Sequence, residues 1–323
     1  MATTIKDVAQ RAGVGVGTVS RVLNGGKSVN KQTQQRVLEA IKELNFVPNQ
    51  MASRLRKDES GIIALLVPVV NHPFFAKLAY FVEDEADRFG YSVLLVSSQK
   101  RMEKERNILH RIRRREVDGA IFVTHFEHDD KELQGCPLVS IDRPLGEDIP
   151  YVTSDNYDAT KKAVEYLLEK GCKRIGYVGS KPLVESEVLK REEAYLDVMK
   201  AHGLPPRIKN DAILHGDESN VVSEFLQSYP DVDGVFASGY TMAQVLYETA
   251  VQRGIAVPNQ MQIVSYDGSF KQWSDNYFLT CVEQPIEAMA RTVVRLLIDK
   301  IEGKQVEMRT MLKTDFLIGI TTK

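Results

Sequence analysis

The sequence predicts a small helical head followed by a larger α/β body made of two doubly wound subdomains. Residues 1–60 contain short stretches whose apolar side chains recur at helical spacing. From Gly61 onward, β-rich apolar runs alternate with amphipathic helical stretches, which is typical of parallel sheets with crossover helices. The chain has 323 residues, and because one domain usually has roughly 100 to 200 residues, we expect more than one.

Composition indicates an ordinary folded protein, with 43% hydrophobic and 27% charged residues. Cys136, Cys172 and Cys281 are widely spaced, which favours buried, reduced thiols over a disulfide framework. The N-terminal residues lack the pattern of a signal peptide, and the longest apolar run, Gly61–Val70, is too short to span a bilayer. We therefore expect a cytoplasmic protein with no membrane contact.

Charge is unevenly distributed along the chain. The net formal charge is −2, yet residues 1–60 carry 10 Lys and Arg against 5 Asp and Glu, whereas the remainder carries 32 against 39. A basic head on an acidic body indicates that a polyanionic partner would be met by the head.

Three helices are expected in the head. Thr4 can cap a helix over Ile5–Ala12, and Gly13 ends it. A tight turn leads into a second helix, Val16–Leu23, and a third, Lys31–Leu44, completes a core that two short helices could not form alone. Two short helices joined by a tight turn are the signature of a helix-turn-helix motif.

The second helix has an apolar and a polar side. Val19 and Val22 face the core, whereas Thr18, Arg21 and Asn24 lie on the opposite side, free to enter a DNA major groove where Arg21 could read guanine. Two other interpretations remain. The same periodicity fits a helical pair with no nucleic-acid role. Gly13-x-Gly15 also begins like a dinucleotide-binding loop, but no strand precedes it and Thr18 replaces the third glycine.

Several segments of the head form a characteristic string, namely Ile5–Ala9, Gly13-Val14, Thr18–Asn24, Leu44–Asn49, and then Ala52 and Leu55. This string resembles the headpiece of the LacI/GalR family of bacterial transcription repressors. One departure is that Gly15, Val16 and Gly17 stand where the family usually has Ser and two larger or polar residues. Sequence-specific contacts with the bases would then depend mainly on Arg21 and on Val16, which could contact a thymine methyl group. The expected DNA contacts are Ile5, Val16, Gly17, Thr18, Arg21, Asn24, Thr33, Asn49, Ala52, Leu55 and Arg56.

The resemblance implies a DNA-binding headpiece over residues 1–48 and a hinge over residues 49–60. The hinge would fold as a helix on DNA, pair with its dimer mate through Met51 and Ala52, and insert Leu55 into the minor groove with Arg56 alongside. A flexible basic linker is the alternative. Because such a segment is too short to form a helix alone, the geometry of the body could switch DNA affinity without touching the headpiece.

The body resembles the periplasmic-binding-protein-like core of the same family. Its N-terminal subdomain would comprise residues 61–156 plus 285–312, and its C-terminal subdomain residues 157–284 plus 313–323. The expected strands are Ile62–Val69, Ser92–Ser97, Gly119–Val123, Arg174–Val178, Ala212–Leu214, Val232–Ala237 and Ile263–Tyr266. The expected helices are Phe74–Phe89, Glu103–Arg115, Tyr157–Lys170, one near Glu187–His202, Met242–Arg253 and Ile286–Glu302.

Ligands of open α/β sheets bind beyond the carboxyl ends of the strands. The aromatic, carboxylate, guanidinium and amide groups there suit a sugar, although a purine would also fit. The family resemblance implies effector contacts at Phe74, Asp142, Arg191 and Asp267, while Tyr240 stands where the family usually has a polar residue, so stacking is expected there. The expected effector-binding residues are Asn71, Phe74, Phe75, Gln99, His125, Asp142, Arg143, Arg191, Tyr240, Asp267 and Trp273. Trp273 fits a core position equally well.

Within the family, the motifs Asp142-Arg143, Ile149-Pro150, Ser154–Asn156 and Tyr266–Gly268 resemble most closely the sucrose-operon-repressor subgroup. No enzyme is expected, because neither a G-x-S-x-G nucleophile turn nor a P-loop occurs in the sequence. The loop around His125 and His128 has no metal-binding spacing, and neither a metal nor a cofactor is expected.

The sequence therefore predicts a bacterial, cytoplasmic, homodimeric repressor that binds a pseudopalindromic operator, responds to a sugar or phosphosugar and regulates carbohydrate utilisation genes. No heptad repeat follows the last strand, which favours a dimer over a tetramer. Two alternatives remain: a pleiotropic catabolite regulator that uses a phosphorylated carrier protein as corepressor, and a sugar-binding receptor with no DNA role.

Overall fold

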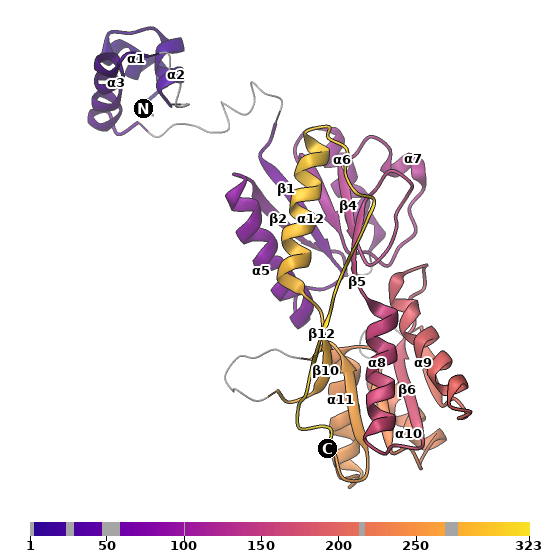
Figure 1. Cartoon of the computed structure of the whole chain (residues 1–323). Coiled ribbons are helices and arrows are strands. Elements are labelled where there is room, and N and C mark those ends of the chain that lie inside the picture. The colour runs from indigo at the N-terminus through magenta and orange to yellow at the C-terminus, as the bar shows by residue number, and fades with distance from the viewer. Residues whose placement is uncertain (1–2, 24–28, 47–58, 100, 213–216, 269–276) are drawn as a thin grey trace. The chain divides into compact units, whose positions relative to one another are not determined.

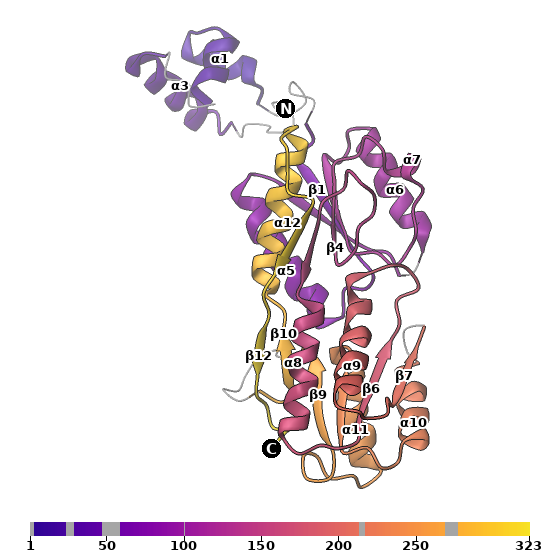
Figure 2. The same ribbon diagram turned by 45° about the vertical axis from the view of Figure 1, so that its right-hand side comes forward.

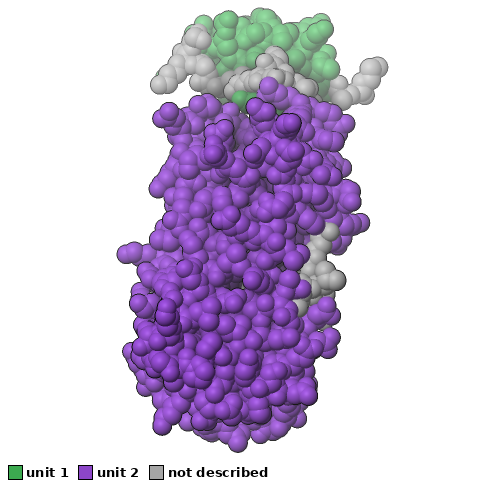
Figure 3. Space-filling model, turned by 90° about the vertical axis from the view of Figure 1, so that its right-hand side faces the viewer, with its two compact units in different colours: residues 1–60 green, residues 61–323 purple. Residues whose placement is uncertain are grey.

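The computed structural model describes residues 3–23, 29–46, 59–99, 101–212, 217–268 and 277–323. The chain divides into two compact units, Met1–Ser60 and Gly61–Lys323, which Figure 3 colours separately. Within the described residues, no helix is both long and apolar enough to cross a membrane. Nor does this part of the chain gather three His, Cys, Asp or Glu side chains as a metal site would require.

The first unit contains the three helices that the sequence predicts, α1 (Ile5–Ala12), α2 (Val16–Leu23) and α3 (Lys31–Glu43). A capping box begins α1: the Thr4 hydroxyl accepts from the Asp7 amide, and the Asp7 carboxylate accepts from the Thr4 amide at 2.8 Å. Gly13 ends α1 in a left-handed conformation with φ of 62°, which lets the Val14 amide return to the Ala9 carbonyl at 3.0 Å.

The core of the head draws one fully buried valine from each helix, Val8, Val19 and Val37. Helices of eight residues are marginal in isolation, so this shared burial is what stabilises α1 and α2. An exposed ion pair between Arg11 and Glu43 (2.6 Å) links α1 to α3, but it adds little because both groups are well solvated.

The second unit contains two six-stranded sheets with the same strand order. Sheet A, in the order β11-β5-β4-β3-β1-β2, is parallel throughout. Its strands are β1 (Ile62–Val67), β2 (Ser92–Ser97), β3 (Gly119–Phe122), β4 (Leu138–Ile141), β5 (Tyr151–Ser154) and β11 (Arg309–Leu312). Its helices are α5 (Pro73–Arg88) and α12 (Ile286–Ile301) on one face, and α6 (Met102–Arg113) and α7 (Asp130–Leu133) on the other (Figure 1).

Sheet B repeats this arrangement in the order β12-β10-β9-β8-β6-β7, with only β12 antiparallel to its neighbour among the described strands. Its strands are β6 (Ile175–Ser180), β7 (Ile208–Asp211), β8 (Gly234–Ala237), β9 (Gln262–Tyr266), β10 (Thr280–Glu283) and β12 (Asp315–Leu317). Its helices are α8 (Asn156–Glu169) and α9 (Lys190–Ala201) on one face, and α10 (Glu218–Ser228) and α11 (Tyr240–Gln252) on the other. A single 3-10 turn, η1 (Glu187–Leu189), precedes α9.

Each sheet is buried on both faces. In β1, Ile63 and Leu65 pack beneath α5 and α12, whereas Ala64 and Leu66 pack beneath α6, and all four are fully buried. Alternate residues of a strand point to opposite faces, so a strand covered on both sides reads as the continuous apolar run seen in the sequence. The predicted class, a helix-turn-helix head and an α/β body of two doubly wound halves, is confirmed.

Not every predicted element was right. The strand observed nearest to the predicted Ala212–Leu214 is β7, which ends at Asp211; Ala212 is not in a strand, and residues 213 and 214 lie outside the described part of the chain. As an edge strand β7 pairs only with β6, so it tolerates the polar run Lys209–Asp211 that an apolar criterion misses. Strands β5, β10, β11 and β12 and helices α7 and α10 were not among the predicted elements.

The chain passes between the sheets three times, at residues 154–156, 283–286 and 312–315. Figure 2 shows the last of these passages in yellow. Strands β5 and β10 both end at a passage, and each runs parallel to an inner neighbour, β5 to β4 and β10 to β9. The carboxyl ends of the two parallel sheets therefore face each other, which is where a ligand of such a fold is expected.

Gly17 and Gly13 provide a matched test of the geometry of the head. A Cβ atom at Gly17 would meet nothing within 4 Å, so Gly17→Ala should stabilise α2 by about 0.5 kcal/mol. Gly13 has φ of +62°, so Gly13→Ala should destabilise the head by about 1 kcal/mol. Hydrogen exchange of the Val19 and Val22 amides measures both effects. Slower exchange in Gly13→Ala would contradict the assigned turn.

Candidate functional site

The facing edges of the two sheets bring three charged side chains into one cluster. Asp142 follows β4, Asp267 follows β9, and Arg191 lies in the first turn of α9. Burial raises the pKa of both carboxyl groups, and the charge of Arg191 lowers the pKa of both. The charge of Asp142 also raises the pKa of Asp267. Residues that are distant in the sequence thus form one electrostatic unit between the carboxyl ends of the two sheets, the place that we call the cleft.

Arg191 is held in a fixed orientation although its side chain is only 5% exposed. Its Nε donates to Asn156 Oδ1 at 2.7 Å, and its Nη1 donates to the Ser238 carbonyl at 2.7 Å. The guanidinium carbon lies 3.4 Å from the centroid of the Tyr266 ring, which stacks beneath it. Within the described residues Nη2 donates no hydrogen bond, so this charged donor is available to an acceptor in the cleft.

Asp142 connects the cleft to sheet A. Its amide donates to the Val152 carbonyl at 2.9 Å, and its carboxylate accepts from Thr153 Oγ1 at 2.8 Å. Burial raises the pKa of Asp142, and the nearby charge of Arg191 and the Thr153 hydrogen bond only partly oppose this effect.

Asp267 occupies the matching position in sheet B. Its amide donates to the Val282 carbonyl at 2.8 Å, and both carboxylate oxygens lie 3.0 Å from the donating Nε2 of Gln284. Burial raises the pKa of Asp267 to about 6, against the opposing effects of Arg191 and Gln284. The repeated topology thus presents one aspartate from each half to the cleft.

The backbone at the cleft is unusual at three positions, Gln99, Asp142 and Asp267, whose φ values are 52°, 62° and 62°. Each follows a strand, and all were predicted from the sequence as effector contacts. Left-handed conformations of non-glycine residues cost of order 1–3 kcal/mol and gather at functional sites. Their placement here supports the assignment of this edge as a binding site.

A buried hydrogen-bond network joins the two aspartates. Ser154 Oγ lies 2.8 Å from Tyr266 Oη and donates to Gln284 Oε1 at 2.8 Å. Asn156 Nδ2 donates to Thr153 Oγ1 at 3.2 Å. These five residues were not predicted as site residues, although Ser154, Asn156 and Tyr266 fall in motifs that carry the family resemblance. They hold the charged groups and span both halves.

The other predicted effector residues differ in their exposure to solvent. Asn71, Gln99 and His125 are exposed. Phe74, in the first turn of α5, is buried in the core between this helix and sheet A, and the half-buried Phe75 meets it edge to face at 5.3 Å.

Arg143 is nearly buried and donates to the Phe126 carbonyl (2.8 Å) and pairs with Glu127 (3.1 Å), so its charge is engaged within its own half. Tyr240 begins α11 and lines a hollow together with Tyr247 and Phe278. Trp273 lies outside the described residues.

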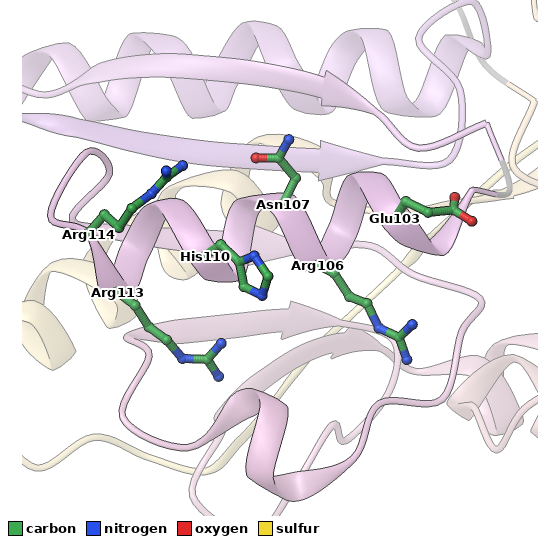
Figure 4. Close-up of a pocket in the computed structure, with 6 residues that line it drawn as sticks. All are labelled: Glu103, Arg106, Asn107, His110, Arg113 and Arg114. Carbon is green, nitrogen blue, oxygen red and sulfur yellow. The ribbon is translucent and has the colours of Figure 1, made fainter.

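A further hollow lies on α6, as shown in Figure 4. Its lining residues are Glu103, Arg106, Asn107, His110, Arg113 and Arg114. Arg106 pairs with Glu132 at 2.9 Å, Arg114 pairs with Glu116 at 3.1 Å, and Arg113 donates to the Glu132 carbonyl. The hollow contains none of the predicted effector residues, and its arginines are already bound to neighbouring oxygens.

The head presents part of the predicted DNA contacts on one face of α2. Val16, Gly17 and Arg21 are exposed there, and Thr18 is half-buried. Thr33 is also half-buried and its hydroxyl accepts from Arg36 at 3.5 Å.

Ile5 packs partly against the core of the head, which limits its reach. Asn24, Asn49, Ala52, Leu55 and Arg56 lie outside the described residues.

Comparison with known proteins agrees with this architecture. The family model for bacterial regulatory proteins of the lacI family matches residues 4–49. The model for periplasmic binding proteins and the sugar binding domain of the LacI family matches residues 60–319. The chain belongs to the LacI family. The helix-turn-helix and the two-sheet body are thus the two parts of a LacI-family regulator.

Relatives in the LacI family cover nearly the whole chain. The ribose operon repressor of Halalkalibacterium halodurans is 38% identical, over 99% of this chain and 97% of the relative. The sucrose operon repressor of Streptococcus mutans is 30% identical, over 99% of both chains. A solved structure described as a complex of the transcriptional regulator CelR with cellobiose is 30% identical, with a TM-score of 0.72 over 99% of both chains.

Asp267 should make the stability of the protein depend on pH. Its pKa is about 6 in the fold against an ordinary value of 3.8, so the folded state holds more protons between these values and stability falls as pH rises through this window. At pH 7 the loss is on the order of 3 kcal/mol. Asp267→Asn should remove most of it, so that urea unfolding of the variant changes less between pH 4 and 7 than that of the wild type. Equal pH slopes for the two proteins would exclude Asp267 as the cause.

Proposed function

We propose that the protein is a repressor of carbohydrate utilisation genes whose operator affinity is controlled by a sugar bound between the two sheets. The observation that carries the proposal is the cluster of Asp142, Arg191 and Asp267. Buried carboxyl groups with raised pKa values reduce stability at neutral pH. Such groups are expected where a ligand needs them. Relatives named as repressors of ribose and sucrose operons support the carbohydrate role.

The charge of the cluster favours a neutral sugar over a phosphosugar. Two carboxylates meet a single guanidinium at the cleft, and Arg143 is engaged by Glu127. A phosphate group would bring roughly two further negative charges to this place. Hydroxyl groups, by contrast, can donate to the carboxylates and accept from Arg191 Nη2. The cellobiose complex of the relative CelR agrees with a neutral ligand.

The head would bind operator DNA through the exposed face of α2. Arg21 can donate two hydrogen bonds to guanine, and Val16 can contact a thymine methyl group. Residues 49–60 would then form the hinge, with Leu55 as the wedge in the minor groove. Ligand-dependent geometry of the body would act on DNA affinity through this segment. No step of this function requires an enzymatic reaction or a cofactor, and we assign the protein to the bacterial cytoplasm.

A second copy of the chain is the partner expected on the body. Val251 on α11 and Phe278 are 53% and 44% exposed, and Tyr247 packs edge to face on Phe278 at 4.7 Å. Exposed apolar groups of this kind favour a protein interface. A homodimer would match the two-fold symmetry of a pseudopalindromic operator.

Release of operator DNA by a sugar tests the proposal. The protein should retard specific fragments of the genome of its source, and one neutral sugar in a panel should change that retardation. Arg21→Ala should reduce specific affinity by about 1–3 kcal/mol, because a bidentate base contact is lost. Asp142→Asn should keep the DNA affinity and lose the response to the sugar.

Asp87→Asn, which removes an exposed carboxylate from α5, is the matched control and should behave as the wild type. Retardation that no sugar alters would contradict control by the cleft. A response to phosphosugars alone would contradict the neutral ligand.

A further inference from the structure

Residues 186 and 187 connect the two halves of the body on the side of Asp142. They belong to the segment between β6 and α9, in the half that contains sheet B. The Glu187 amide donates to the Asp142 carbonyl at 2.9 Å, and Ser186 Oγ donates to the same oxygen at 3.0 Å. The carbonyl group of Asp142, which belongs to the half that contains sheet A, is therefore hydrogen-bonded by the half that contains sheet B.

The Glu187 side chain adds two further contacts to the half that contains sheet A. Tyr151, the first residue of β5, donates its hydroxyl to Glu187 Oε1 at 2.9 Å. Arg309, the first residue of β11, places Nη2 3.2 Å from the same oxygen. Lys190 pairs with the carboxylate at 2.5 Å from within its own half. One side chain thus joins the starts of two strands to the loop before α9.

Glu187 is well suited to hold a charge at this place. It is only 8% exposed, and burial alone would raise its pKa. Hydrogen bonds from Lys190 and Tyr151 outweigh that effect, so the pKa lies below its ordinary value and the carboxylate is ionised at neutral pH. Its negative charge also contributes to the raised pKa of Asp142.

We propose that Glu187 is a clasp that keeps the cleft closed and a positioning residue for Asp142. Within the described residues the two halves are joined covalently at three passages of the chain, so opening the cleft separates residues 186 and 187 from Asp142, Tyr151 and Arg309. These contacts involve only groups of the chain itself. The chain itself therefore supplies part of the free energy of closure, and a ligand needs to supply only the remainder. The part of this proposal that concerns ligand binding rests on the proposed function.

The clasp is tested first without any ligand, by hydrogen exchange of the Glu187 amide in the full-length protein. Glu187→Gln and Arg309→Gln should each speed this exchange at least about tenfold, because closure loses a charged contact. The double variant should show less than the sum of the two effects, since both changes remove the same interaction. Glu185→Gln, at an exposed position two residues away, should leave the exchange unchanged.

Two further measurements separate a clasp from general destabilisation. The amides of β8 should exchange as slowly in every variant as in the wild type, and Arg309→Lys, which keeps the charge, should restore most of the protection of Glu187. With the sugar found for the wild type, Glu187→Gln should weaken binding about tenfold, mostly through faster dissociation.

Unchanged exchange at Glu187 in both single variants would overturn the clasp. Faster exchange with unaltered sugar affinity would overturn the positioning of Asp142. If the wild type binds no sugar, the proposed function fails, while the exchange measurements still decide the clasp.

Discussion

The buried guanidinium of Arg191 is the constraint on which the rest of the cleft depends. A charge that is removed from water must be paired or well hydrogen-bonded. Here Asn156 and the Ser238 carbonyl accept from it, and the Tyr266 ring lies beneath it. These partners come from different elements around the point where the chain passes between the sheets. The same charge moderates the cost of ionising Asp142 and Asp267, so both aspartates can face one cleft.

The proposed control of the head by a small ligand depends on the geometry of the body. The head and the body are separate compact units, and we propose that the body acts on DNA binding through the segment that links them. A ligand shifts the populations of an open and a closed cleft only by its difference in affinity for the two states. Contacts such as those of Glu187 set how large this difference must be.

Sequence reasoning predicted the head better than the body. The caps at Thr4 and Gly13 and the apolar spacing around Val19 define the helices locally, and the structure agrees with them. Edge strand β7 was misplaced because its polar residues are determined by pairing rather than by burial. At the site, Asp142, Arg191 and Asp267 were expected from family resemblance and from positions at strand ends. The roles of Thr153, Tyr266 and Gln284 depend on how two halves meet, and no local pattern encodes that. Strand-end position alone also could not show that Phe74 would be buried in the core.

The coupling between the cleft and the DNA-binding head is tested most directly by measuring sugar affinity calorimetrically, with and without saturating operator DNA. Thermodynamic linkage requires that operator DNA change the affinity for the sugar by the same factor by which the sugar changes the affinity for the operator. If the cleft controls the head, this factor will differ from one and agree between the two titrations. An affinity for the sugar that is the same on and off the operator would contradict control of the head through the cleft.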